Sequence, residues 1–166
     1  MQNQSITPRT TFVGLLEADQ PQAMAWVTGA PGTDLSGLVK FYQTPFAGVL
    51  VEAELFNLPD MNTPGSSQFY ALHIHEFGDC TNSFQNTGEH YNPAKLPHPE
   101  HAGDLIPLLS NGGYAWIAFY TNRFTVGDIL GRSVVIHSHP DDFTTQPSGN
   151  SGTKIGCGVI RAAHQN

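Results

Sequence analysis

The stretch "FYALHIHEF", residues 69–77, is a short run of aromatic and aliphatic residues that leads into the turn "GDC" at residues 78–80. Short runs of this kind, separated by segments rich in Gly, Pro, Asn and Asp, are typical of β-strands joined by turns. Further runs with strand character lie at residues 23–29, 35–43, 48–58, 113–120, 133–139, 154–162 and, more briefly, 123–126. No segment shows a sustained helical period. The sequence therefore predicts an all-β fold, a Greek-key β-sandwich or barrel of about eight antiparallel strands.

The composition agrees with one such domain. The chain has 166 residues, of which 39% are hydrophobic and 13% charged, with 17 Gly and 12 Pro. This length suits a single core, which we place at residues 23–163, between an N-terminal extension at 1–22 and a tail at 164–166. The net charge of -7, with only seven Lys and Arg, argues against a nucleic-acid partner.

The first 22 residues contain no sustained apolar run, so we expect neither a signal peptide nor a membrane anchor in this sequence and no membrane partner. We therefore expect a cytoplasmic protein if this is the full chain, with an extracellular or periplasmic location as the alternative. Cys80 and Cys157 lack the CxxC spacing of a zinc–thiolate site. Their positions alone leave open two free thiols or one disulfide.

Histidines recur with the two-residue spacing of a strand. In a strand, residues i and i+2 point to the same face, so His73 and His75 could hold one metal ion between them. A solvent-facing pair is the alternative. His137 and His139 repeat the spacing at a strand end, before Pro140. We expect one ligand from this second pair and a solvent-facing His139.

A second set of potential ligands lies in a long connection rather than in a strand. His98, His101 and Asp104 follow one another at three-residue steps after His90. Three imidazoles and a carboxylate suit a tetrahedral zinc site, although a polar surface loop with incidental histidines is the alternative. Connections 78–112 and 140–153 are much longer than hairpin turns, and we expect both to fold over the site.

Five segments together resemble the copper/zinc superoxide dismutase family, and the resemblance runs from about residue 23 to residue 162. These segments are "HIHEFGDC", "GEHYNP", "HAGDL", "GRSVVIH" and "GNSGTKIGCGVI". The resemblance implies conversion of two superoxide ions and two protons into O2 and H2O2, with copper and zinc as cofactors. Members of this family are dimers or monomers, so a homodimer is possible.

The resemblance also assigns the site residues one by one. It implies copper ligands at His73, His75, His90 and His137, and zinc ligands at His90, His98, His101 and Asp104. His90 would then serve both metals and carry a proton in the reaction. Asp141 would hydrogen-bond a ligand of each metal, and Cys80 and Cys157 would form the disulfide of the family.

One departure from the family concerns the residue that guides the anion. The family usually has an arginine just before the C-terminal cysteine strand, where this chain has Lys154. A lysine keeps the charge but loses the planar fork of donors. Because loop 140–153 also contains two aspartates and no Lys or Arg, we expect weak electrostatic steering of superoxide.

Two other functions compete with dismutation. The first is a zinc- and copper-binding protein on the same fold with little or no turnover, since a fold does not fix a function. The second is zinc-assisted hydrolysis, which needs an open coordination position. The closed set of three histidines and one aspartate argues against hydrolysis.

Overall fold

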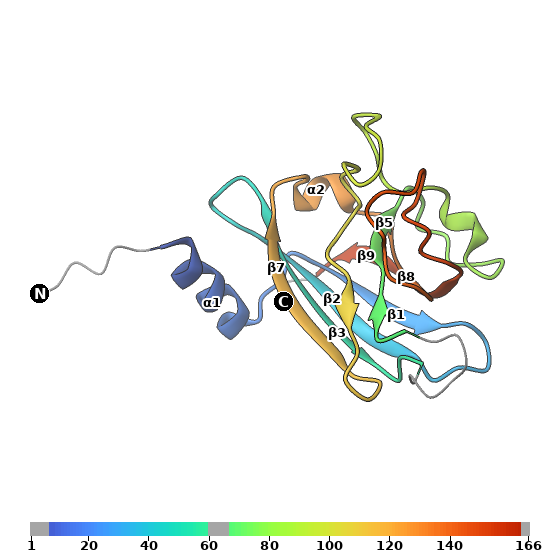
Figure 1. Cartoon of the computed structure of the whole chain (residues 1–166). Helices are drawn as coiled ribbons and strands as arrows, with labels where there is room; N and C mark the ends of the chain where they lie inside the picture. The colour runs from blue at the N-terminus through green and yellow to red at the C-terminus, as the bar shows by residue number, and fades with distance from the viewer. Residues whose placement is uncertain (1–6, 60–66, 164–166) are drawn as a thin grey trace, which may run out of the picture.

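The computed structural model describes residues 7–59 and 67–163 (Figure 1). Within these residues the chain forms nine strands and two α-helices. The helices are α1 (Pro8–Ala18) and α2 (Val126–Ile129), and a 3-10 turn, η1, spans Gln85–Thr87. The strands are β1 (Ala23–Gly29), β2 (Ser36–Gln43), β3 (Val49–Phe56), β4 (Phe69–Tyr70), β5 (Leu72–His75), β6 (Leu108–Leu109), β7 (Ala115–Thr121), β8 (Ser133–His137) and β9 (Lys154–Ala162).

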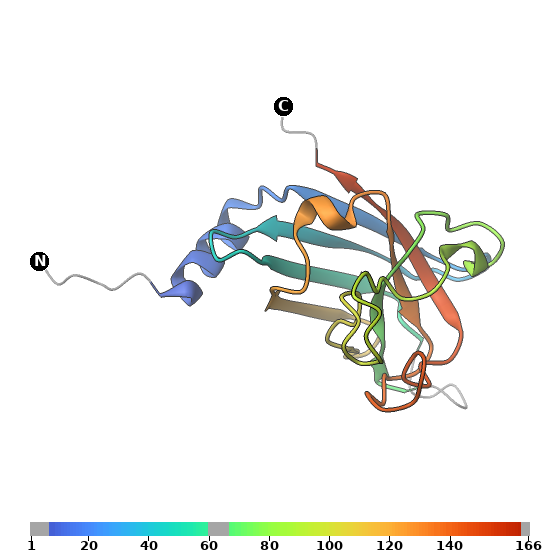
Figure 2. The ribbon, with the colours of Figure 1, turned by 90° about the horizontal axis from the view of Figure 1, so that it is seen from above.

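The strands form a curled antiparallel sheet in the order β5-β8-β9-β1-β2-β3-β7, while β4 and β6 pair separately. This arrangement confirms the all-β prediction. The connections after β5 and after β8 lie at the same end of the molecule, and α1 lies at the opposite end (Figures 1 and 2). The sheet thus brings two long loops together, as expected from their length.

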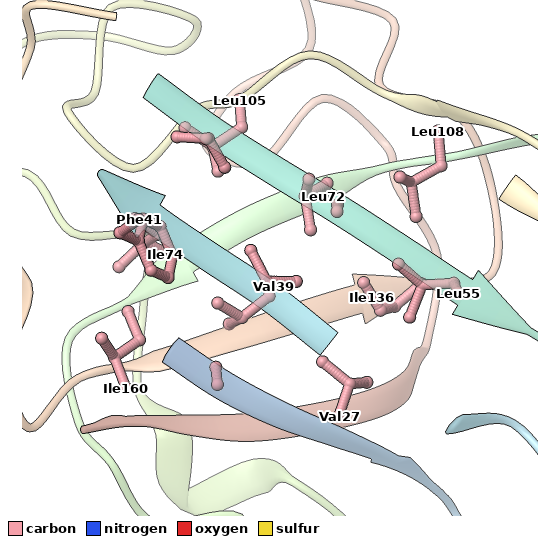
Figure 3. Packing of buried hydrophobic residues seen from close by; sticks show 14 of the residues in the cluster. Val27, Val39, Phe41, Leu55, Leu72, Ile74, Leu105, Leu108, Ile136 and Ile160 are labelled. Atoms are coloured by element: carbon pink, nitrogen blue, oxygen red, sulfur yellow. The ribbon is translucent and has the colours of Figure 1, made fainter. Parts of the chain in front are cut away.

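The core fills the inside of the curl because alternate residues of each strand point inward. Val39 and Phe41 of β2, Leu55 of β3, Leu72 of β5 and Ile136 of β8 are all buried there (Figure 3). The runs at residues 23–29 and 154–162 match β1 and β9 residue for residue. The sequence-predicted strand 69–77 is interrupted at Ala71, whose carbonyl accepts from His137 N.

The prediction of no helical segment is wrong at the N-terminus. Helix α1 begins after Thr7, whose side chain caps Thr10 N, and it has Pro at its start. Phe12 stacks on the Tyr120 ring with centroids 5.2 Å apart and makes a T-shaped contact with the Phe46 ring. Tertiary packing therefore supports a helix whose own sequence gives a weak signal. Neither described α-helix is long and apolar enough to cross a membrane.

The short strand predicted at 123–126 is also wrong. Thr125 and Asp128 form a reciprocal capping box, so the chain enters α2 at Val126. The Arg123 side chain turns instead toward the long connection between β5 and β6. Strand β6 was not predicted, because its two residues are too short to give a periodic pattern. The predicted tail at 164–166, with His164, lies outside the described residues.

We expect Leu55→Ala to lower the free energy of unfolding by about 2–5 kcal/mol, because Leu55 is fully buried and its removal leaves a cavity. The neighbouring Phe56→Ala is the matched control. Phe56 is 44% exposed on the opposite face of β3, so its loss should cost about 1 kcal/mol or less. Urea denaturation followed by circular dichroism measures both. Equal losses would contradict the assigned inside and outside of this sheet.

Candidate metal centre

Strand β5 supplies the first two histidines of the centre. Leu72 and Ile74 point into the hydrophobic core, so His73 and His75 point to the other face of the strand. Both imidazoles are buried, at 0% and 2% exposure. His137 stands at the end of β8, the strand that pairs with β5, and is also buried. Strand alternation therefore places the three side chains in one buried space.

The long loop of residues 76–107 is fixed to β5 through Ile74. Ile74 N donates to Gly103 O at 2.9 Å, and Tyr91 N donates to Ile74 O at 2.8 Å. A Cβ on Gly103 would collide with the Ile74 carbonyl oxygen, so only glycine permits this approach. These bonds bring His90 beside His75 and Asp104 beside His73 as bridge partners.

The first cluster consists of four buried imidazoles from β5, β8 and the long loop. One nitrogen from each of these residues lies within 4.8 Å of the others; the set is His73, His75, His90 and His137. His75 Nδ1 must donate to the Gly88 carbonyl at 2.9 Å, which leaves its Nε2 without a proton. That Nε2 faces His137 Nε2 at 3.2 Å. His137 Nδ1 lies 3.5 Å from the Gly152 carbonyl, and when it carries the ring proton His137 Nε2 also presents a lone pair, so that a cation fits between the two rings.

The second cluster gathers around one carboxylate. Its members are His90, His98, His101 and Asp104. All four are buried, and one potential metal-ligand atom of each lies within 4.8 Å of the others. Asp104 oxygens lie 2.7 Å from His90 Nδ1, 3.0 Å from His98 Nδ1 and 3.4 Å from His101 Nδ1. The seven residues between His90 and His98, and the two between His98 and His101, therefore suffice to bring these histidines together with Asp104. Three nitrogens and one oxygen are the donor set that tetrahedral zinc accepts.

Asp141 connects the two clusters through hydrogen bonds to one histidine of each. Its Oδ2 accepts from His73 Nε2 at 2.8 Å, and its Oδ1 accepts from His98 Nε2 at 2.8 Å. Each bond consumes the Nε2 proton of a neutral imidazole, so the Nδ1 lone pair of each ring points toward its cluster. Asp141 also accepts from Phe143 N, which fixes the carboxylate in its turn.

Four buried nitrogens have no hydrogen-bond partner within the described part of the chain. They are His73 Nδ1, His90 Nε2, His98 Nδ1 and His101 Nδ1, two facing each cluster. Buried polar atoms are seldom left unpaired, because each costs about 1–3 kcal/mol. Nitrogen lone pairs that converge in this way fit metal ions, and the residues present thus fit the copper and zinc that the resemblance implies.

Burial controls the protonation of the first cluster in the metal-free protein. It lowers the pKa of His73 to about 4, although the hydrogen bond to Asp141 acts in the opposite direction. Burial also lowers the pKa of His137 to about 3 and that of His75 further. The pKa of Asp141 is lowered, because hydrogen bonds from His73, Phe143 N and His98 outweigh its burial. Neutral imidazoles and an ionised carboxylate are the forms that metal binding needs.

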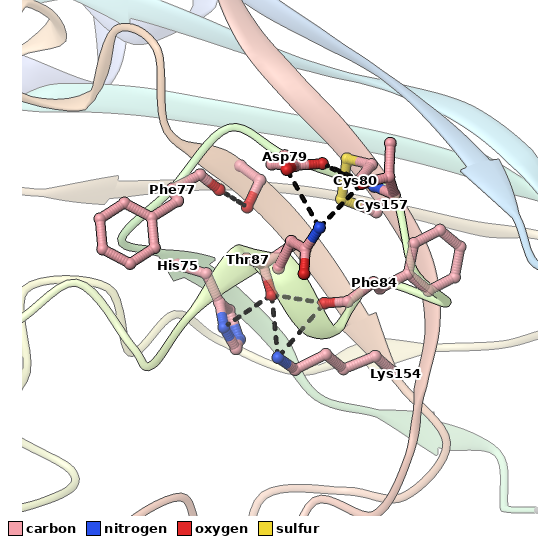
Figure 4. Close-up of a disulfide and its surroundings, with 11 residues drawn as sticks. His75, Phe77, Asp79, Cys80, Phe84, Thr87, Lys154 and Cys157 are labelled. Atoms are coloured by element: carbon pink, nitrogen blue, oxygen red, sulfur yellow. Dashed lines mark hydrogen bonds between the residues drawn. A yellow bond between two sulfur atoms is a disulfide. The ribbon is translucent and has the colours of Figure 1, made fainter.

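The disulfide predicted from the resemblance is confirmed between Cys80 and Cys157 (Figure 4). It joins the long loop to β9. Lys154, at the start of β9, extends toward the same loop, where its Nζ contacts Thr87 and Gly88. Burial lowers the pKa of this ammonium, and the nearby charge of Glu89 opposes the effect. His139 is exposed and belongs to neither cluster among the described residues.

Sequence reasoning missed two arginines that hold the long loop. Arg123 Nη1 donates to the carbonyls of Pro99 and His101, at 2.9 and 3.1 Å. Arg132 donates to Glu76 O at 2.9 Å and stacks on the Tyr91 ring. Both act on backbone atoms or ring faces, which leave no spacing pattern in the sequence. Thr87, also missed, is an ordinary turn residue by sequence.

Comparisons with known proteins give a family match over most of the chain. A family model described as copper/zinc superoxide dismutase matches residues 35–160. The extracellular superoxide dismutase [Cu-Zn] of Rattus norvegicus is 34% identical over 155 residues, which cover 88% of this chain and 58% of that protein. The chain thus spans little more than half the length of this relative. Superoxide dismutase [Cu-Zn] 3 of Arabidopsis thaliana is 32% identical over 161 residues, 87% of this chain and 94% of that protein.

Two further relatives bear other names. The copper chaperone for superoxide dismutase of Homo sapiens is 31% identical over 147 residues, 81% of this chain and 51% of that protein. The crystal structure of the clock protein EA4 superposes with a TM-score of 0.73 and 28% identity, covering 86% of this chain and 96% of that one. The same architecture therefore occurs in proteins that carry different names.

We expect the metal-free protein to lose stability as the pH falls from about 6.5 toward 4. The folded histidines have a lowered pKa, so below pH 6.5 the unfolded chain binds more protons than the folded one and is favoured. The pKa of Asp104 and Asp141 is also lowered, but these carboxylates act mainly below about pH 5, nearer their unfolded value. Urea unfolding after chelator treatment at pH 7.5, 6.5, 5.5 and 4.5 measures this. A flat profile down to pH 5 would show that the imidazoles are not held neutral.

Proposed function

Because the chain belongs to the copper/zinc superoxide dismutase family, we propose that it converts two superoxide ions and two protons into O2 and H2O2. The observation that carries the proposal is the position of His90. Its Nε2 faces the first cluster and its Nδ1 faces the second, so one imidazole is common to both. A simple zinc-binding protein has no need of two buried cation sites that share a ligand.

The chemistry of the donors supports copper in the first cluster and zinc in the second. Four imidazoles, His73, His75, His90 and His137, suit copper, while the carboxylate-containing set His90, His98, His101 and Asp104 suits zinc. Copper, when bound, supplies the one-electron couple that zinc lacks. We propose these residues as the ligands.

The contribution of His90 itself is to hold and deliver a proton. Its Nδ1 is fixed by Asp104, and its Nε2 is the atom that can alternate between carrying a proton and donating a lone pair. The side chain is 4% exposed, so the proton would be held close to the reacting anion and away from bulk water. Asp141 keeps His73 and His98 in the tautomers that leave both clusters intact.

Access for the anion depends on few charges. We propose that Lys154 supplies the positive charge near the first cluster, in the place of the usual arginine. Glu89 lies close enough to affect the pKa of Lys154, and its carboxylate is exposed next to His90. Together with Asp142 in the connection 140–153, Glu89 opposes long-range attraction of an anion. Weak steering therefore stays our prediction, and a homodimer stays one of the states that the family allows.

A metal-binding protein with little turnover is the second candidate. The specific observations in its favour are the lysine in place of arginine and the acidic residue beside it. A relative named as a copper chaperone shows that this architecture is not confined to proteins named as dismutases. Zinc-assisted hydrolysis is not supported, because every donor of the second cluster is committed to one closed set.

The decisive experiment combines metal analysis with superoxide consumption after copper and zinc loading. We expect about one copper and one zinc per chain and rapid consumption by the unaltered protein. His90→Ala should retain the fold, lose the ligand common to both clusters, and lower activity by about a hundredfold or more. His139→Ala is the matched control, since His139 is an exposed histidine two residues from His137. Its activity should be unchanged.

Different outcomes separate the candidates. Two bound metals without superoxide consumption would favour the metal-binding protein. Zinc uptake without copper uptake would contradict the assignment of the first cluster. Equal loss in the His90 and His139 variants would show that activity follows overall stability rather than the shared imidazole.

A separate prediction concerns the charge of Glu89. Glu89→Gln should raise kcat/KM for superoxide by about twofold or more at low ionic strength, because it removes a negative charge next to Lys154. The gain should shrink at about 0.15 M salt, where exposed charges are screened. Glu17→Gln on α1, at the far end of the molecule, is the control for net charge and should have no effect. An equal gain in both variants would mean that only overall charge matters.

A further inference from the structure

Thr87 is a fully buried polar residue in the wall beside the first cluster, and no motif accounts for it. Its hydroxyl has one hydrogen, which it donates to Phe84 O at 2.8 Å, since a carbonyl can only accept. The hydroxyl oxygen is then free to accept from Lys154 Nζ at 2.9 Å (Figure 4). Thr87 thus joins a backbone carbonyl of the long loop to the ammonium of β9.

Lys154 has no remaining donor in this arrangement. An ammonium carries three N–H groups and no acceptor. Three acceptors surround it: Thr87 Oγ1 at 2.9 Å, Gly88 O at 3.2 Å and Phe84 O at 3.4 Å. All three belong to the long loop. The lysine is therefore attached to the loop, where an arginine with five N–H groups would retain donors for an anion.

The same two segments are already joined covalently. Cys80 of the loop is bonded to Cys157, which lies three residues after Lys154 on β9. Phe84 packs against Cys157 and Val135 beside the disulfide. The contacts of Thr87 with Lys154 thus form a second, non-covalent connection between the loop and β9. Its far end reaches a metal-site histidine, because Gly88 O also accepts from His75 Nδ1.

We propose that Thr87 is the positioning residue for Lys154, and that the ammonium serves the site as a fixed positive charge rather than as a hydrogen-bond donor to the anion. The part that concerns the anion rests on the proposed function; the positioning does not. Thr87 Oγ1 supplies the hydrogen-bond acceptor that holds the Lys154 ammonium against the long loop. Lys154 in turn holds Gly88 O where it orients His75.

Lysine acylation tests the positioning without any need for turnover. The chain has three lysines, Lys40, Lys95 and Lys154, so mass spectrometry can follow each one after brief treatment with acetic anhydride. Thr87→Val keeps the shape but removes the hydroxyl, and should raise the acylation rate of Lys154 about tenfold, as expected for a lost hydrogen bond to a charged group. Thr87→Ser keeps the hydroxyl and should leave the rate near that of the unaltered protein. Exposed Lys95 is the internal reference.

The outcomes are distinct. If Lys154 in the Thr87→Val protein reacts no faster than in the unaltered protein, Thr87 does not position it and the proposal fails. If the rates of ion-paired Lys40 and Lys154 rise together relative to exposed Lys95, the variant has loosened the whole chain; Thr87→Ala then replaces it, with the same two criteria. This arm gives its answer even if the protein consumes no superoxide.

A second arm tests the fixed charge. In the copper- and zinc-loaded protein, Lys154→Met should lower kcat/KM, and the loss should be larger at low ionic strength than at about 0.5 M salt, because the long-range part of a charge effect is screened. Lys154→Arg, which keeps the charge and adds N–H donors, should raise kcat/KM above that of the unaltered protein; no gain from arginine would mean that the lysine already donates to the anion and would overturn this part of the proposal. Absence of turnover in the unaltered protein would contradict the proposed function and leave the acylation result standing.

Discussion

Two backbone hydrogen bonds at Ile74 hold the metal-site loop against β5, and the rest of the centre depends on them. Through these bonds His90 and Asp104 lie opposite His75 and His73, while the Ile74 side chain stays in the core. The same residue thus faces the hydrophobic interior with its side chain and the functional loop with its backbone. A loop of this length would otherwise carry a large conformational entropy, and its ligands would not converge.

Bringing these imidazoles together in a buried space has an electrostatic cost. Four buried imidazole nitrogens have no hydrogen-bond partner among the described residues, and His75 Nε2 lies only 3.2 Å from His137 Nε2, so the surrounding structure holds polar atoms in an unfavourable arrangement. The disulfide, the backbone bonds at Ile74 and the arginines that donate to loop carbonyls all act on the loop rather than on the ligands. The scaffold is therefore built to keep the donors in place in spite of their mutual repulsion, which is how a metal site becomes organised before its ion arrives.

Sequence alone predicted what depends on periodicity and residue type. The spacing of His73 and His75 placed them on one strand face, and the run at 154–162 marked β9 from end to end. Helix α1 was not predicted, because it is stabilised by the packing of Phe12 on Tyr120, a contact between residues far apart in the chain. The role of Thr87 was not predicted for a related reason: it depends on a hydrogen bond from Lys154, which lies 67 residues away in the chain. Pairings across such distances are set by the folded chain and leave no local pattern.

Asp141 gives the two clusters a common dependence. One carboxylate accepts from His73 with one oxygen and from His98 with the other, and His90 belongs to both sets. If metal ions bind at these residues as we propose, occupation of one cluster fixes groups that the other cluster also needs ordered, so the two binding equilibria would be thermodynamically linked. Such linkage is reciprocal: whatever factor the first ion contributes to the affinity for the second, the second contributes to the affinity for the first. In the proposed assignment Asp141 therefore links the two ions without touching either of them, beside the direct link through His90.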